Sequence, residues 1–308
     1  MGKFVVAGIT QVETIVRVDK VPITYAPLTT EVNSIYTGLG GDAYNESLAL
    51  RWLGDEVEFM SIIGRDRSAN DLNPVGSNIE LSTKYVVQQM EETPTCVILY
   101  DKDRRRQIFE DIKDLRDKVY DMSMFPPLGG WADMVVLANA NFCRPFAKAA
   151  AEYNKKIAVN IRNFNREKEK YNKDFLEVAS ILYFSDDTLD EDPYDFIKGM
   201  SKTYGTDIVI MGQGAEGVIL FDKNRDLIAH YNTVKTNEIV NTVGAGNALF
   251  ACFLHYYQET GDSVNAIKNA LLFSSYKIGY MGTSNGFMTT EQMDQWRNLI
   301  WGIRPNGL

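Results

Sequence analysis

The chain has 308 residues, and its 32 Lys and Arg against 41 Asp and Glu give a formal net charge of −9 at pH 7. This acidic balance counts against a protein that coats nucleic acid or an anionic membrane, because both need a basic field. The sequence has no apolar run of the ~20 residues that a membrane helix needs, and its start lacks the pattern of a secretory signal. We therefore expect a cytoplasmic protein that binds neither nucleic acid nor a membrane.

The cysteines and histidines exclude several further classes of site. Cys96, Cys143 and Cys252 are odd in number and far apart, which disfavours a disulfide framework or a zinc cluster. With only His230 and His255 in the chain, a Ser-His-Asp triad or a multi-histidine metal site is disfavoured as well.

The N-terminal third alternates short apolar runs with turn-rich, polar segments. The runs predict strands at Phe4–Ile9, Thr14–Val18, Val57–Ile63 and Cys96–Tyr100. Segments 11–37 and 90–110 together predict a small β-sheet that folds over one edge of the body and could act as a lid.

The rest of the chain alternates β-branched runs with helical periodicity, which is typical of a parallel sheet covered by helices on both faces. Strands are predicted at Met134–Ala138, Ile157–Ile161, Ile181–Ser185 and Ile208–Met211. Helices are predicted at Phe142–Tyr153, Asp174–Ala179, Pro193–Thr203, Gly244–Gln258 and Ser263–Tyr280. Without an internal repeat or a linker, we expect residues 1–308 to form a single α/β domain that carries the small sheet.

The segment Gly212–Gly217 matches the G-x-G-x-x-G pattern of dinucleotide-binding proteins. That pattern needs a helix directly after it, because the pyrophosphate rests on the helix N-terminus. Here Val218–Phe221 continues as a strand, so we interpret the glycines as a turn between two strands.

Two other glycine loops lead directly into helices. In the later one, Gly244, Ala245, Gly246 and Asn247 precede an apolar helix, whose free backbone N–H groups could hold a transferring phosphoryl group. In the earlier one, Gly40 and Gly41 would let a ligand approach the backbone, and Asn45 could hydrogen-bond to hydroxyl groups. Each loop taken alone is equally compatible with a tight turn that only serves packing.

In combination, these motifs resemble the ribokinase family of carbohydrate kinases, also called the phosphofructokinase-B family. The resemblance rests on the Gly40-Gly41 loop with Asn45, on Ile63-Gly64-Arg65-Asp66, and on the late Thr242–Asn247 motif. Gly8–Glu13, Val159–Arg162 and Gly214–Gly217 follow the family order as well. The resemblance implies a three-layer α/β sandwich with a small β-sheet lid, and ATP-dependent phosphoryl transfer to a hydroxymethyl group of a sugar or nucleoside.

The resemblance also implies roles for individual residues. Glu13, Gly40, Gly41, Asn45 and Arg162 would bind the sugar or nucleoside, and Gly244, Ala245 and Gly246 would hold the γ-phosphate beside Asn247. ATP would lie along Ser185, Gly214, Gly217 and Asn269, with Mg²⁺ on its phosphates. Pairing of two lids would make the protein a homodimer.

The sequence departs from the family at the late motif. Asn247 stands where the family has the Asp that takes the proton from the attacking hydroxyl, and an amide cannot hold that proton at neutral pH. Asn241 replaces the first Asp, which counts against the monovalent-cation site that many members have near this loop. Ser185 and Thr188 stand where members carry Asn-x-x-Glu, which leaves the Mg²⁺ ligands open. A substitute acid and a solvated helix cap are both compatible with the nearby Asp186, Asp187 and Asp190.

Two functions therefore stay open. The first is a carbohydrate kinase, slowed by the loss of its base. The second is a catalytically impaired protein of the same fold that binds a sugar or nucleotide. The sequence does not select the sugar or nucleoside.

Overall fold

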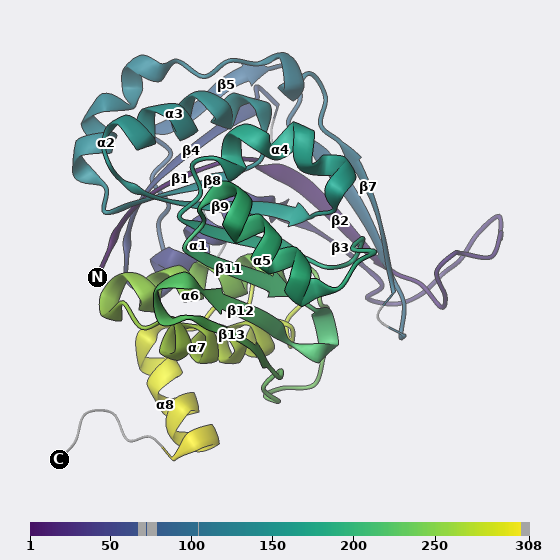
Figure 1. The fold of residues 1–308 in the computed structure, drawn as a ribbon. Helices are drawn as coiled ribbons and strands as arrows, with labels where there is room; N and C mark the ends of the chain where they lie inside the picture. Colours follow the sequence, from purple (N-terminus) through teal and green to yellow (C-terminus); the bar gives the residue numbers. More distant parts are fainter. Residues whose placement is uncertain (67–71, 73–78, 104, 303–308) are drawn as a thin grey trace.

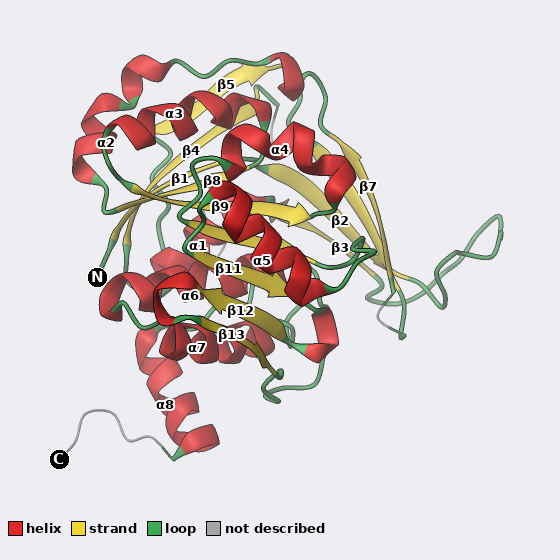
Figure 2. Ribbon diagram, in the orientation of Figure 1, coloured by secondary structure: helices red, strands yellow, loops and turns green. Residues whose placement is uncertain are grey.

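The computed structural model describes residues 1–66, 72, 79–103 and 105–302. Within these residues a large sheet of nine strands lies beside a small sheet of four (Figures 1 and 2). The large sheet has the order β13 (Leu227–Tyr231), β12 (Val218–Asp222), β11 (Ile208–Gly212), β10 (Ile181–Ser185), β9 (Lys156–Asn163), β8 (Met134–Ala138), β1 (Lys3–Ala7), β4 (Glu56–Gly64) and β5 (Tyr85–Met90). The small sheet has the order β3 (Ile35–Gly40), β2 (Gln11–Arg17), β6 (Thr95–Tyr100) and β7 (Arg106–Asp111).

The large sheet separates two apolar cores because successive side chains of a strand point to opposite faces. In β1, Phe4 and Val6 pack into one core, and Val5 and Ala7 into the other. The first core also takes side chains from α1 (Asp42–Trp52), α6 (Ala245–Thr260), α7 (Ser263–Lys277) and α8 (Thr290–Trp301). The second takes side chains from α2 (Pro126–Trp131), α3 (Arg144–Glu152), α4 (Glu169–Leu176) and α5 (Pro193–Tyr204). The predicted three-layer α/β sandwich is confirmed.

Seven neighbouring strands of the large sheet are parallel, in the spatial order β11, β10, β9, β8, β1, β4 and β5. The strands β12 and β13 are added antiparallel at the β11 edge. In the small sheet β2 pairs parallel with β6 and antiparallel with β3, and β6 pairs antiparallel with β7. Its four strands overlap the predicted segments 11–37 and 90–110, although β3 extends to Gly40 and β7 to Asp111. None of the helices in the described ranges has the length and apolar character needed to cross a membrane.

The structure corrects some predicted bounds. The helix predicted at Asp174–Ala179 is α4, which begins at Glu169 and ends at Leu176. Its first turns carry mainly charged and polar side chains, so the apolar pattern shows only where Phe175 and Leu176 are buried. Helix α7 ends at Lys277 rather than at Tyr280.

The Gly212–Gly217 interpretation agrees with the structure. The strands β11 and β12 pair antiparallel, with Gly212 opposite Val218. Gly214 and Gly217 have φ angles of 57° and 112°, which glycine adopts without strain. The segment is therefore a hairpin connection and not a dinucleotide-binding turn.

Candidate active site

A buried carboxyl group organises the first half of the site. Glu13, on β2, is 5% exposed, and its Oε1 accepts hydrogen bonds from Gln11 Nε2 at 2.9 Å and from the Gly41 amide at 3.1 Å. Its Oε2 accepts one from Thr283 Oγ1 at 2.5 Å. Burial raises the pKa of Glu13, but all three partners are donors and favour the carboxylate. The pocket thus offers the oxygens of a hydrogen-bonded carboxyl group as acceptors to a ligand hydroxyl.

The glycines of this pocket leave room for that carboxylate. A Cβ at Gly40 would lie 2.2 Å from Glu13 Cδ, so any side chain there would displace it. Gly41, the N-cap of α1, has a φ of 102°, and a Cβ would lie 2.3 Å from the Ile9 carbonyl oxygen. Asn45, in the first turn of α1, accepts from Thr283 Oγ1 at 3.3 Å. The structure therefore brings Glu13, Gly40, Gly41 and Asn45 together.

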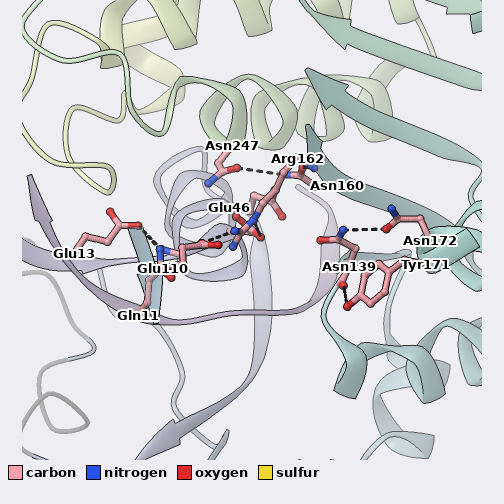
Figure 3. A network of polar contacts seen from close by, with 12 residues as sticks. Gln11, Glu13, Glu46, Glu110, Asn139, Asn160, Arg162, Tyr171, Asn172 and Asn247 are labelled. Carbon is pink, nitrogen blue, oxygen red and sulfur yellow. Dashed lines mark hydrogen bonds and ion pairs between the residues drawn. The ribbon is translucent and has the colours of Figure 1, made fainter. Parts of the chain in front are cut away.

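Arg162 lies at the end of β9 and is held by two carboxylates. Its Nε donates to Asp42 Oδ2 at 2.7 Å, and its Nη1 donates to Glu110 on β7 (Figure 3). Burial raises the pKa of Asp42, and the guanidinium opposes that shift. Arg162 thus ties the small sheet to the start of α1, and the structure does not place it among the partners of Glu13.

The second half of the site is the loop that starts α6. Gly244 is the N-cap, with a φ of 81°, and a Cβ there would lie 2.7 Å from the Thr283 carbonyl oxygen. The Ala245 amide bonds back to Thr242 O at 3.3 Å. In the described part of the chain, the amides of Gly246 and Asn247 have no hydrogen-bond acceptor. Together with the helix dipole, these two amides can bind an anion.

A chain of polar side chains connects Asn247 to a buried carboxyl group. Asn160, on β9, donates through Nδ2 to Asn247 Oδ1 at 3.1 Å and to Glu46 Oε1 at 2.6 Å (Figure 3). Glu46 is 0% exposed, and its Oε2 has no partner among the described residues. Burial raises the pKa of Glu46 well above its ordinary value, which favours the neutral form.

A cavity of about 350 Å³ lies beside α7, away from the Glu13 pocket. Asn269 lines it and is 1% exposed, and its Oδ1 has no partner among the described residues. The wall also includes Tyr231 and Asn232, and a Cβ at Gly217 would lie 2.0 Å from the Tyr231 carbonyl oxygen. Gly217 therefore lies against Tyr231, which lines the cavity together with Asn269, but neither Gly214 nor Gly217 lines the cavity itself.

Ser185 does not line that cavity. It ends β10, and its Oγ donates to Asp187 Oδ2 at 3.0 Å, while Arg106 forms an ion pair with the same oxygen at 2.8 Å. The described residues hold no cluster of three or more His, Cys, Asp or Glu that could bind a metal. Magnesium that entered with a nucleotide would therefore take most of its ligands from phosphate and water.

Several residues of this site could not be identified from the sequence. Thr283 joins both halves, since its hydroxyl contacts Glu13 and its backbone lies against Gly244. Glu46 follows directly after Asn45, and Lys277 ends a helix, a place where a lysine is ordinarily solvated. Their burial depends on the tertiary packing of distant segments. The Asn160-Ile161-Arg162 motif was the one signal that pointed to Asn160.

Comparisons with known proteins find relatives of this sequence and of this fold. A deoxyribokinase from Salmonella typhi is 30% identical over 111 residues, a match that spans 35% of this chain and 35% of that protein. A microbiome-derived acarbose kinase has a structure with a TM-score of 0.82 at 20% identity, over 96% of this chain and 98% of that one. A Burkholderia thailandensis nucleoside kinase in complex with inosine gives 0.77 at 17% identity, over 98% and 100%.

A profile of the pfkB family of carbohydrate kinases matches residues 1–291, which is nearly the whole chain. The matched range includes Glu13, the loop at the start of α6 and Asn269. The chain belongs to the pfkB family of carbohydrate kinases.

Proposed function

We propose that this chain is an ATP-dependent kinase that phosphorylates a hydroxymethyl group of a sugar or nucleoside. The position of Thr283 carries the proposal, because it joins the Glu13 pocket to the loop of Gly244. A hydroxyl held in the pocket would face the free amides at the start of α6, as in-line transfer requires. The relatives, which include a deoxyribokinase and a nucleoside kinase with inosine, support this class of acceptor.

The residues of the pocket suit an acceptor with neighbouring hydroxyl groups. Glu13 and Asn45 would accept hydrogen bonds from them, and the two glycines Gly40 and Gly41 would let the ring approach the backbone. Arg162 would act on the acceptor indirectly, because it holds Asp42 at the start of α1.

The Asn269 cavity suits the base of ATP. An exocyclic amine of a purine could donate to the unpartnered Oδ1 of Asn269, and Gly217 lies against Tyr231 in the wall of the same cavity. ATP supplies the phosphoryl group when bound. Ser185 would not contact the base; at the end of β10 it donates a hydrogen bond to Asp187.

In the proposed transfer, the acceptor oxygen bonds to the γ-phosphorus while the bond from phosphorus to ADP breaks. The amides of Gly246 and Asn247 would stabilise the charge on the phosphoryl oxygens. Asn247 can orient the hydroxyl but cannot keep its proton, which must pass to water or phosphate. Because a positioned base contributes ~10²–10⁴ in rate, we expect slow turnover.

A second function, binding without transfer, is favoured by one observation. The Oδ1 atom of Asn247 already accepts a hydrogen bond from Asn160, and the carboxyl of Glu46 behind it is biased towards its neutral form. Neither group is therefore ready to take a proton at neutral pH.

The experiment that separates the two functions begins with a thermal-shift screen of sugars and nucleosides, with and without ATP and Mg²⁺. Any ligand that raises Tm is then incubated with ATP, and mass spectrometry looks for the phosphorylated product. Slow formation of a product supports the kinase, and binding without product supports the second function. No thermal shift and no calorimetric heat at millimolar ATP would contradict both.

The small sheet supports a further proposal, that two copies pair as a homodimer. Val97 and Phe109 lie opposite each other on β6 and β7 and are 40% and 52% exposed. A second small sheet packed on this face would cover both side chains. Sedimentation of the protein at micromolar concentration tests this, and a monomer would contradict it.

A further inference from the structure

Lys277, the last residue of α7, has an unusual environment for a lysine. Its side chain is 0% exposed, and its Nζ donates to Val243 O at 2.5 Å and to Gly282 O at 2.6 Å. In the described part of the chain, no carboxylate forms an ion pair with it. Burying an ammonium costs free energy unless hydrogen-bond acceptors satisfy it. At Lys277 the two backbone carbonyl groups are those acceptors.

The two carbonyl groups come from the segments that shape the site. Val243 directly precedes Gly244, the N-cap of α6, and Gly282 directly precedes Thr283. Through these two hydrogen bonds, Lys277 connects the loop at the start of α6 to the segment that contains Thr283. Two further contacts fix the loop on α7: Ser274 Oγ donates to Ala245 O at 2.9 Å, and the Asn241 amide donates to Ile278 O at 3.1 Å.

Converging backbone carbonyls are also the ligands that proteins offer to K⁺. A monovalent cation near this loop is what the family resemblance implies, but the residues present do not suit one. The ammonium takes the carbonyl of Val243, and Asn241, which replaces the family acid, is neutral. The Oδ1 atom of Asn241 accepts a hydrogen bond from the Val243 amide, and its Nδ2 is a donor that is buried without a partner among the described residues, so this side chain offers a cation no charged ligand.

We infer that the ammonium of Lys277 is a built-in substitute for a free monovalent cation: it orders the Val243–Asn247 loop and makes the protein independent of K⁺. The carboxylate of Glu13 adds a favourable field, although burial lowers the pKa of Lys277 to about 7. The effect on phosphoryl transfer rests on the proposed function, whereas the effect on the loop does not.

The test uses three variants of the full chain and thermal unfolding without ligand. Lys277→Ala removes the ammonium and leaves space, Lys277→Met removes it but fills the space, and Lys198→Ala changes an exposed lysine on α5 as a control. Each Tm is measured in about 0.1 M KCl, NH₄Cl or choline chloride, because choline matches ionic strength but is too large to enter.

We expect wild type and Lys198→Ala to give the same Tm in all three salts. Lys277→Ala and Lys277→Met should each lose about 5 °C or more in choline. In KCl or NH₄Cl, the Tm of Lys277→Ala should recover by about half of this loss, whereas the Tm of Lys277→Met should not recover. The same pattern is expected for ATP affinity by calorimetry, if ATP binds.

Two results would overturn the inference. One is a wild-type protein whose Tm is higher in KCl than in choline chloride, which needs no variant to fold. The other is a Lys277→Ala loss that no cation repairs, because the lysine would then only anchor the end of α7. If ATP does not bind but the Tm pattern holds, the proposed function fails and the inference about Lys277 stands.

Discussion

Two buried glutamates, Glu13 in the pocket and Glu46 behind Asn247, differ in how the fold satisfies them. Both lie away from water, and burial raises the pKa of each. Glu13 accepts three hydrogen bonds from donors, whereas Glu46 accepts one and keeps an oxygen without a described partner. Burial alone therefore does not decide the charge of a carboxyl group, because donors can restore it.

The difference extends to what each half of the site can do. The pocket keeps a hydrogen-bonded carboxyl group as an acceptor for hydroxyl groups, with glycine at the positions that give it room. The transfer side keeps its anion-binding amides but has an amide, Asn247, and a carboxyl biased towards neutrality, Glu46, where a base is needed. Under the proposed function, the site would therefore bind its ligands better than it transfers the phosphoryl group.

The largest effect is expected at the glycine that shapes the pocket. Gly41→Ala should lower the free energy of unfolding by about 3 kcal/mol or more, because its φ of 102° and ψ of 157° are nearly restricted to glycine and the Cβ meets the Ile9 carbonyl. Urea unfolding measures it. The control Gly205→Ala has a φ of 79° but open space around the Cβ, so about 1 kcal/mol is expected. Equal losses would contradict the close packing described for Gly41.

The next effect tests the charge of the pocket. Glu13→Gln should weaken binding of the best ligand from the screen by about 10–100-fold, because an NH₂ group replaces one acceptor oxygen. Calorimetry measures the affinity, and Glu91→Gln, on an exposed residue, should leave it unchanged. An unaltered affinity in Glu13→Gln would mean that the ligand does not use this carboxylate.

A smaller effect, which depends on pH, tests the neutral form of Glu46. Its raised pKa means that the unfolded chain loses this proton near pH 4.5 while the folded chain keeps it, so its contribution to stability falls as pH rises above 4.5. Glu46→Gln removes that dependence. The variant should equal wild type near pH 4 and exceed it by about 1 kcal/mol at pH 7 to 8. A constant difference across this range would show that Glu46 is ionised in the folded protein.

Much of the fold could be predicted because the central strands are apolar on both faces. The strands Met134–Ala138 and Ile181–Ser185 have the predicted bounds. The strand β7 was missed because all six of its residues are exposed and most are polar or charged. Its pairing with β6 depends on the position of the small sheet and not on a local pattern.

The residues of the site likewise divide into those that a local sequence pattern predicts and those that it does not. The glycines could be predicted because a turn before a helix is a local feature. In the structure the Gly41 amide and the Thr283 hydroxyl both donate to Glu13, and Gly244 lies against the Thr283 backbone. Lys277 and Glu46 could not be predicted, because a charged residue in a helical pattern is ordinarily solvated. Their burial follows from the packing of α7 and α1 against segments far away in sequence.

We propose that Asn247 limits phosphoryl transfer in a site that still binds its ligands. The most direct measurement is the rate of product formation by Asn247→Asp beside wild type, with ATP and the best acceptor from the screen. We expect a gain of at least about tenfold, because a carboxylate at this position can take the hydroxyl proton. An unchanged rate with every acceptor tested, while ATP and acceptor still bind, would contradict it.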